Sequence, residues 1–489
     1  MMGIQEGQPE LFDYQINLEK RVRADNPLRQ VNEVVDFQFV RTEVAALYGY
    51  NGNESVDPAV ILKMMFLLFF DNVASERELM HIIAERLDYL WFLGYPLAAA
   101  IPHHSVLSKA RARWGREAFE KFFLRSVGQC VAAGLVDGRK IHVDSSLNDA
   151  NASCDSVVKS SPELIAALKA AYQATESKLD DATTPDSYEA VNDRVLSTTD
   201  PDAAMVRKGN GQSRPRYHHH RAVDDARGVI TAVETTPGSI AENKRLLPLV
   251  EQHKTNTEQS VQTIVGDHKY GTAENFVACQ QRGIRTHLGD ARAKQNHARS
   301  QGIFPDSAFT YDACTNTYRC PAGQTMKPRR LHPTKRTWEY QLPKAVCAAC
   351  ALRRQCTRAK LYGRTIHRHE DQELLDRARD QAHSPAARRD RQRRQHLAEA
   401  SFADAANQHG FKRARWRRLW RVQIQDWLIA AIQNIRLLLR QGSLPVATAG
   451  NAGVGGPDFV RHRSCWGIAW SMNALFRSLG PFPLLWGQN

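Results

Sequence analysis

The spacing of apolar residues changes once along this chain, and the change separates two kinds of structure. From about Phe37 to Phe123 apolar residues recur every three or four positions, as in "AVILKMMFLLFFDN" and "REAFEKFFLRSV", which predicts packed helices. Ser75, followed three residues later by Glu78, predicts the start of one of them. Strand-like segments begin only after Gly138. We therefore expect a helical N-terminal domain in residues 1–130, followed by an α/β domain in residues 138–440.

The α/β domain contains short apolar segments separated by turn residues. They are residues 140–144, 217–224, 228–236, 262–267 and 283–289. The second and third are joined by "DDARG", which predicts a hairpin. Helical patterns follow in "SIAENKRLLPLVEQH", "RRQHLAEASFADAANQ" and "QIQDWLIAAIQNIRLLLR". The predicted order is strand, hairpin, helix, strand, strand, insertion and helix.

Two insertions and a tail interrupt or follow this order. Residues about 150–215 contain a helical pattern, "PELIAALKAAYQATESKL", and then "STTDPDAAMVRKGNGQSRPR", whose polar residues, glycines and prolines predict a surface loop. Residues about 290–390 are rich in cysteine. Residues 441–489 change from Gly and Ala to apolar residues, and their role stays open.

The charge balance indicates the class of partner. The 489 residues include 66 Lys and Arg against 52 Asp and Glu, a formal net charge of +14, which favours a polyanion such as nucleic acid. No run approaches the roughly 20 apolar residues of a membrane span, and the start "MMGIQEGQPELFDYQ" lacks the pattern of a signal peptide. We expect a cytoplasmic protein without a membrane partner, whose nine cysteines are reduced or bind metal.

Two carboxylates end strands of the predicted sheet. Asp144 follows Ile141 and Val143, and Asp267 follows "TIVG". A single aspartate at a strand end is usually a turn former. Two such residues in one sheet indicate a shared site, because converging carboxylates hold two divalent cations about 4 Å apart in phosphoryl-transfer enzymes. A third ligand is expected on a helix packed against these strands.

Glu399 is the best candidate for this third ligand. It lies in a predicted helix within the most basic part of the chain, where a phosphate backbone is expected to bind. A solvated glutamate is the alternative interpretation. Asp404 is the local competitor, but it lies on a different side of the same helix.

Basic residues near these motifs are candidates for DNA contacts. The segment "IPHHSVLSKARARWG" predicts a short basic helix that resembles the recognition helix of a helix-turn-helix motif. A solvent-exposed helix face would explain its charges equally well. A second basic group surrounds Glu399. The candidate DNA-binding residues are Lys109, Arg111, Arg113, Arg393, Arg394, Arg415, Arg417 and Arg418.

Together these motifs resemble a bacterial insertion-sequence transposase of the DDE class. The matching segments are "SERELMHIIAERLDYLWFLG", "IHVDSSLNDANAS", "YHHHRAVDDARGVITAVETTPGSIAEN", "TIVGDHKYGTAEN" and "AEASFADAANQHGFKRARWRRLWRVQIQ", and the resemblance covers about residues 30–440. It implies a catalytic domain with an RNase H-like mixed sheet and flanking helices, preceded by the all-α domain and carrying the Cys-rich insertion.

The resemblance also assigns the catalytic residues. Asp144 and Asp267 match the first two metal ligands and Glu399 the third, with Mg²⁺ or Mn²⁺ as the cofactor. Such families commonly have Glu, two variable residues, Phe and Gly, and here Ala403 replaces the final Gly after Phe402.

Histidines and cysteines raise the question of further metal sites. His218 to His220 would point to alternate faces of a strand, which predicts structural roles. Cys320, Cys347, Cys350 and Cys356 would complete a structural Zn²⁺ site, with Cys314 left over, because tetrahedral zinc takes four thiolate or imidazole ligands. Thiols without metal are the alternative.

The predicted function is that of a DNA transposase. It would cut the ends of its insertion sequence and join them to target DNA by two-metal phosphoryl transfer. The resemblance implies that terminal inverted repeats and target DNA are its partners and that a homodimer or larger complex forms on DNA. A metal-dependent nuclease of the same fold and an inactive DNA-binding descendant are the alternatives.

Overall fold

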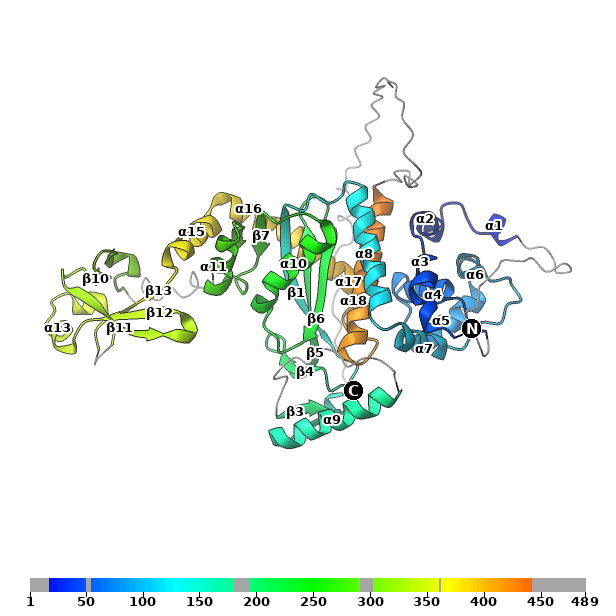
Figure 1. The fold of residues 1–489 in the computed structure, drawn as a ribbon, viewed down its shortest axis with the longest axis horizontal. Coiled ribbons are helices and arrows are strands. Elements are labelled where there is room, and N and C mark those ends of the chain that lie inside the picture. Colours follow the sequence, from blue (N-terminus) through cyan, green and yellow to red (C-terminus); the bar gives the residue numbers. More distant parts are fainter. Residues whose placement is uncertain (1–16, 50–53, 180–193, 291–301, 360–361, 442–489) are drawn as a thin grey trace, which may run out of the picture. The chain divides into compact units, whose positions relative to one another are not determined.

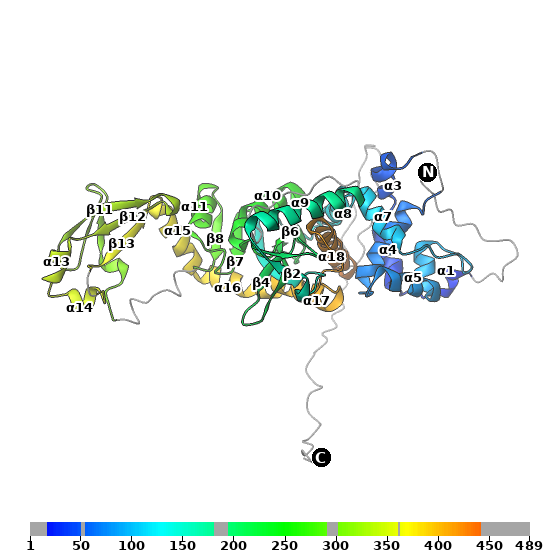
Figure 2. The same cartoon turned by 90° about the horizontal axis from the view of Figure 1, so that it is seen from below.

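A computed structural model describes residues 17–49, 54–179, 194–290, 302–359 and 362–441 (Figure 1 and Figure 2). Nearly all of the predicted tail, from residue 442 onward, lies outside the described residues. The described part combines helices and sheets, so the predicted mixed α/β class is confirmed.

The N-terminal region is helical, as predicted. Its elements are α1 (Leu18–Arg21), α2 (Pro27–Val34), α3 (Phe39–Val44), η1 (Ala45–Leu47), α4 (Pro58–Phe70), α5 (Glu76–Glu85), α6 (Leu87–Leu93), α7 (Ser105–Trp114) and α8 (Glu117–Ala132). Helix α4 is buried along every residue except Lys63 because its sequence is apolar on all sides. The N–H of Glu78 donates to Ser75 Oγ at 3.1 Å, which confirms the predicted start of α5.

Helix α18 (Leu419–Arg440) comes from the far end of the sequence but belongs to the same core. It packs against α8 and α4, and the N-terminal helices share one hydrophobic cluster with it and with Val223, Ile230 and Val233. Figure 1 shows α8 and α18 side by side. The helical region is therefore fastened to the sheet through α18.

The larger sheet contains the predicted strands, but the predicted end of the first one at Asp144 was wrong, because pairing with β5 continues β1 to Asp149. It is built from β1 (Lys140–Asp149), β4 (Ala204–Arg207), β5 (Ser213–Asp224), β6 (Ile230–Pro237), β7 (Thr263–Gly266) and β8 (Arg285–Leu288). Strands β6, β5 and β1 are antiparallel neighbours, whereas β1, β7 and β8 are parallel. The predicted hairpin is present, with the Gly228 N–H bonded to Asp224 O at 3.1 Å.

Helices cover both faces of this sheet. The helical elements that follow or flank its strands are η3 (Glu242–Arg245), α10 (Leu246–Thr257), α11 (Ala273–Gln281), α15 (Gln372–His383), α16 (Pro385–Arg394), η7 (Gln395–Glu399) and α17 (Ala400–Gln408). Ile141 and Val143 of β1 pack with α10, α11 and α15. On the other face, Val223 and Ile230 pack with α17 and α18.

The prediction of a surface loop between residues 197 and 216 was wrong in part. Strand β4 and the first residues of β5 occupy it, and β4 pairs with β5 from Ala204 to Arg207. This edge strand needs no apolar alternation of its own, because the backbone of β5 supplies its hydrogen bonds and only its first residue is fully buried. The same insertion contains η2 (Cys154–Ser156), β2 (Val157–Lys159), the predicted helix as α9 (Pro162–Leu179), and β3 (Val195–Ser197).

A second sheet forms between β8 and α15, in the cysteine-rich part of the sequence. Its strands run in the order β13-β12-β11-β10-β9. They and the short helices beside them are η5 (Asp306–Ala308), β9 (Thr310–Asp312), β10 (Thr317–Arg319), β11 (Thr325–His332), η6 (Pro333–Lys335), β12 (Thr337–Gln341), α13 (Lys344–Ala348), α14 (Arg353–Cys356) and β13 (Thr365–His369).

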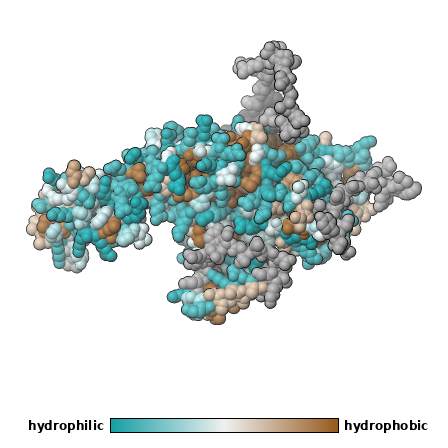
Figure 3. All heavy atoms as spheres, viewed as in Figure 1, coloured by the Kyte–Doolittle hydropathy of each residue, from teal (hydrophilic) through white to brown (hydrophobic). Residues whose placement is uncertain are grey.

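Hydrophilic residues cover most of the face drawn in Figure 3. Within the described ranges, every helix is too short or too polar to cross a membrane.

Candidate active site

Asp144 and Asp267 are brought together by the parallel pairing of β1 and β7. The register pairs Ile141 with Ile264 and His142 with Val265. Asp144 and Asp267 each lie two residues beyond the last of these pairs, and Asp267 follows the end of β7. Asp144 points to the face opposite Ile141 and Val143. The side chains of Asp144 and Asp267 are 14% and 22% exposed, so both carboxylates are accessible from one edge of the sheet.

Small residues allow the loop after β7 to approach its neighbour. A Cβ added to Gly271 would lie 1.8 Å from the carbonyl oxygen of Gly289, and one added to Gly289 would lie 2.7 Å from the backbone nitrogen of His268. The loop is also closed by the Lys269 N–H, which donates to Asp267 Oδ1 at 2.9 Å. The position of Asp267 thus depends on two glycines that admit no side chain.

Glu399 reaches the same edge from a distorted helix. Residues Gln395–Glu399, the element η7, form a π-helical turn between α16 and α17. Such turns carry one extra residue and often occur at functional sites. Glu399 is 45% exposed, and its Oε1 accepts a hydrogen bond from Arg394 Nη2.

Arg394 links the third candidate ligand to the first. Its guanidinium is almost buried, and Nη1 lies 2.9 Å from Asp144 Oδ1 while Nη2 bonds Glu399. Burial raises the pKa of Asp144 to about 6, although Arg394 lowers it, and the carboxylates of Glu399 and Asp267 raise it further. The three acids therefore lie within electrostatic reach of one another.

Lys269 and Glu242 belong to the same cluster and were missed by sequence reasoning. Lys269 Nζ donates to Glu242 Oε1, and Glu242 Oε2 accepts from Ser145 Oγ at 2.6 Å. Although burial alone would lower the pKa of Lys269, its bond to Glu242 and the charges of Asp267 and Asp144 raise it. Lys269 follows Asp267 by two residues, and that spacing was the available signal. Nothing in the sequence around Glu242 marked it.

Asp404 faces away from the two aspartates. Its Oδ2 accepts a hydrogen bond from Gln433 Nε2 at 2.7 Å on α18. His409 first, and then Gln433, lower the pKa of Asp404 to about 2. The geometry thus places Glu399, and not Asp404, near Asp144.

A buried ion-pair network supports the strand opposite Asp144. Arg221 of β5 lies opposite Asp144 in the register of β1 and β5. Its guanidinium donates to Asp426 Oδ1 at 2.8 Å and to Gln433 Oε1 at 2.9 Å, both on α18. His219 Nδ1 lies 2.8 Å from Asp426 Oδ2. Although burial alone would raise it, His219 and Arg221 hold the pKa of Asp426 below its usual value.

The three histidines have the structural positions that the alternation predicted. His219 faces α18, whereas His218 and His220 point to the other face, where His220 Nε2 lies 2.9 Å from Thr236 Oγ1. His218 Nε2 lies 3.0 Å from Ser145 Oγ. All three are buried and hydrogen-bonded.

The candidate DNA-binding residues do not form one exposed group. Arg111 is 4% exposed, pairs with Glu76 and stacks on Trp416, so it cannot reach a phosphate in this structure. Arg394 and Arg418 are also buried, and Arg415 is half-buried with its guanidinium bonded to Leu68 O at 2.7 Å. The exposed members are Lys109, Arg113, Arg393 and Arg417.

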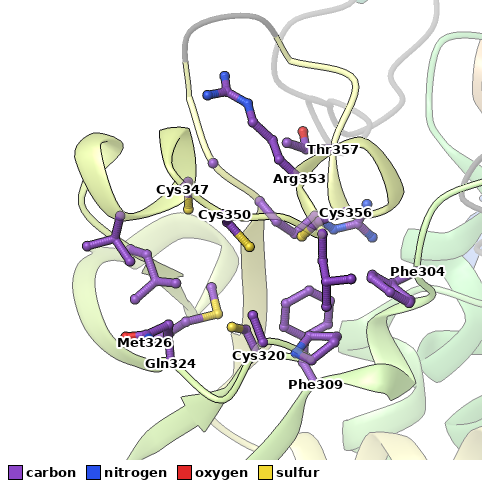
Figure 4. Close-up of a pocket in the computed structure, with 17 residues that line it drawn as sticks. Phe304, Phe309, Cys320, Gln324, Met326, Cys347, Cys350, Arg353, Cys356 and Thr357 are labelled. Carbon is purple, nitrogen blue, oxygen red and sulfur yellow. The ribbon is translucent and has the colours of Figure 1, made fainter.

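Four of the cysteines line a single pocket, drawn in Figure 4. They are Cys320, Cys347, Cys350 and Cys356. Burial raises the pKa of the Cys347 thiol, and the neighbouring Cys350 and Cys320 raise it further. All the cysteines that the structure describes are free thiols. Among the described residues, no three His, Cys, Asp or Glu side chains are placed to hold a metal ion as they stand.

Comparisons with known proteins assign domains at both ends of the described chain. Residues 16–113 match the family described as a transposase domain (DUF772), and residues 319–439 match a transposase DDE domain. No curated protein matches the chain. One solved structure, "Mos1 transposase paired-end complex with left transposon end", is similar to this chain at 9% sequence identity. The match covers 51% of this chain and 64% of the chain in that structure, with a TM-score of 0.16. The two domain matches together support a DDE-class insertion-sequence transposase.

Proposed function

We propose that the protein cleaves the ends of its insertion sequence and joins them to target DNA, with Asp144, Asp267 and Glu399 as catalytic residues. The observation that carries this proposal is the parallel pairing of β1 and β7, which supports a position of Asp144 near Asp267, whose charge acts on it. The link through Arg394 to Glu399 supports the third assignment.

The donor set fits Mg²⁺ or Mn²⁺, because all three side chains offer carboxylate oxygens, which hard divalent cations prefer. Asp144, Asp267 and Glu399 would hold these ions. When bound, such ions activate the attacking oxygen and stabilise the leaving oxygen in phosphoryl transfer. Arg394 neutralises Asp144 and Glu399 in the present arrangement, so its side chain has to withdraw for the carboxylates to act as ligands.

The sheet supports an RNase H-like assignment of the catalytic domain. Three antiparallel strands, β6, β5 and β1, continue into the parallel strands β7 and β8, with helices on both faces. We assign residues 138–440 to this domain, with insertions at about 150–215 and 290–390, and residues 1–130 to a DNA-binding domain that reads the terminal inverted repeats.

DNA is proposed to approach along a groove lined by β1 residues that follow Asp144 in the sequence. Ser145, Glu242 and Lys269 line it, together with the basic residues Arg207 and Lys208. Phosphate contacts from such residues would position the strand without reading its sequence. Lys109, Arg113, Arg393 and Arg417 would add exposed positive charge, whereas Arg111 is left out because it is buried. Two ends cut in one event require a dimer or larger complex on DNA.

A strand-transfer assay tests the proposal. Purified full-length protein is incubated with Mg²⁺ or Mn²⁺, labelled DNA containing the flanks of its own gene, and a supercoiled target. Asp144→Ala, Asp267→Ala and Glu399→Ala are expected to lose joined product, and EDTA to abolish it. Asp404→Asn is the matched control, because Asp404 bonds Gln433 on α18 and should leave product formation within a few-fold of the unmodified chain.

The product pattern separates the alternatives. Joined product that requires metal and all three acids supports the transposase. Cleavage without joining favours a nuclease of the same fold, and binding without cleavage under either metal identifies an inactive descendant. Loss of product in Asp404→Asn but not in Glu399→Ala would identify Asp404, and not Glu399, as the third ligand.

A further inference from the structure

The four cysteines of the second sheet come from separate segments but meet at one place. Cys320 follows β10, Cys347 lies in α13, Cys350 follows it, and Cys356 ends α14. Figure 4 shows their side chains around one pocket, together with Phe309 and Met326. Cys314, in the turn between β9 and β10, is exposed and outside the pocket.

Tight backbone turns present these thiols. The Gly323 N–H donates to Cys320 O at 2.8 Å, and the Cys320 N–H donates to Gln324 O at 3.0 Å. Gly323 has φ of +79°, which a residue with a side chain rarely adopts, so this turn depends on glycine. Cys347 and Cys350 are joined by a second turn, in which the Cys350 N–H approaches Cys347 O at 3.4 Å.

The packing around these turns is too small to explain their order. Among the described residues, five side chains of the second sheet are fully buried, those of Phe309, Tyr318, Met326, Tyr340 and Ile366, and partly buried residues that include Cys320 and Cys356 pack against them. Helices α13 and α14 contain no buried residue and no side-chain cap. Isolated helices this short are not stable in water, and small modules usually require disulfides or a structural metal. Something other than apolar burial has to hold α13 and α14.

We propose that Cys320, Cys347, Cys350 and Cys356 bind one Zn²⁺ ion that fixes α13 and α14 to the sheet. Four thiolates fill a tetrahedral shell, so the site is closed and structural, and binding releases the thiol protons to solvent. The sulfurs of the described residues are not placed to share an ion as they stand, and α13 and α14, which contain no fully buried residue, are the elements that would move to complete the site. The proposal does not rest on the proposed catalytic function.

Metal content of the full-length chain tests the site. The protein is purified in reductant without chelator, in the Asp144→Ala background so that metal at the carboxylates does not contribute, and zinc is measured by inductively coupled plasma mass spectrometry. One zinc per chain is expected. The zinc content of the Cys347→Ser variant should fall at least tenfold. The Cys314→Ser variant, which changes the exposed cysteine of the same module, should keep the full zinc content. A chain that takes up no zinc when it is added, or equal zinc in both variants, overturns the proposal.

A second pair of variants separates ligation from folding. Cys350→Ser removes a ligand, whereas Cys350→His replaces it with another zinc ligand at the same place. We expect zinc to be lost in Cys350→Ser and largely recovered in Cys350→His, and the Co²⁺-substituted protein to show the visible absorption of tetrahedral thiolate cobalt. Equal zinc in the two variants, or alkylation showing that the thiols of the reduced protein are paired as disulfides, would exclude the proposed site.

Discussion

Arg394 Nη1 lies 2.9 Å from Asp144 Oδ1, so the first proposed metal ligand already has a cationic partner. The same guanidinium bonds Glu399 through Nη2. A divalent cation bound at the proposed site would therefore compete with Arg394 for the same two carboxylates. The competition makes Arg394 a positioning residue whose effect appears in metal affinity as well as in turnover.

Arg394→Gln is expected to bind Mn²⁺ about tenfold more tightly, equivalent to about 1.4 kcal/mol, because it removes the competing charge. Isothermal titration calorimetry measures this without DNA or turnover. Without metal the variant should unfold at a lower temperature, since Asp144 loses its partner, and Mn²⁺ should restore the difference. Arg393→Gln is the control, because the adjacent Arg393 pairs with Asp225 instead. Unchanged or weaker Mn²⁺ binding in Arg394→Gln would contradict the competition.

The raised pKa of Asp144 predicts a pH dependence of stability. Because its folded-state pKa is about 6, above the unfolded value, the stability gained by protonation is fully present below about pH 4 and is lost as pH rises through 6. Asp144→Asn cannot titrate. In EDTA, the unfolding free energy of the unmodified protein should fall by about 2 kcal/mol relative to Asp144→Asn between pH 4 and 7. The unfolding free energies of both proteins are measured by urea denaturation at each pH. If they change in parallel with pH, the pKa of Asp144 is not raised in the folded protein.

The buried ion pair on α18 predicts a large stability effect. Asp426→Asn leaves Arg221 without its counter-charge in a site from which water is excluded, and should cost about 3–5 kcal/mol in urea denaturation. The double variant Arg221→Met with Asp426→Leu removes both charges and should recover much of that loss. If the double variant loses as much stability as Arg221→Met and Asp426→Leu lose when their separate losses are added, the two charges do not act as a pair.

The loop that carries Asp267 depends on Gly271. Gly271→Ala places a methyl group against Gly289 O, so we expect a loss of several kcal/mol or a displaced loop with weaker Mn²⁺ binding. Gly128→Ala, in α8, is the matched control: its Cβ meets nothing within 4 Å, and it should stabilise the helix by about 0.5–1 kcal/mol. Thermal unfolding of both variants checks the contrast. Equal behaviour would mean that the loops after β7 and β8 do not approach as described.

Local patterns predicted the strands and the two aspartates. Asp267 directly follows the end of β7, as predicted, but Asp144 lies in the middle of β1, because pairing with β5 extends that strand to Asp149. The meeting of Cys320 with Cys347, Cys350 and Cys356 also followed from spacing, because thiols with ligand spacing in one module tend to converge. The helix that carries Glu399 was predicted, but its π-helical turn was not, since nothing in "RQHLAEA" distinguishes π from α geometry.

Features that depend on distant partners were not predictable. Arg111 has the sequence context of a solvated basic helix, but Glu76 and Trp416, from other parts of the chain, bury it. Strand β4 has only four residues within a mostly polar segment, and it forms because β5 offers an edge to pair with, which its own sequence does not reveal. Glu242 joins the carboxylate cluster only through Ser145 and Lys269.

The π-helical turn has a consequence for how copies of this gene would decay. An α-helix rotates by about 100° per residue, so loss of one codon between Gln395 and Glu399 would restore regular α geometry and turn Arg394 by that angle relative to Phe402. Phe402 is held in the core, so Glu399 or Arg394 would be carried away from Asp144. A copy with such an in-frame deletion would keep the three proposed catalytic acids and nearly all of its sequence identity, but on the proposed function we expect it to be inactive. Helix length in this segment is therefore a better marker of an intact copy than the presence of the acids.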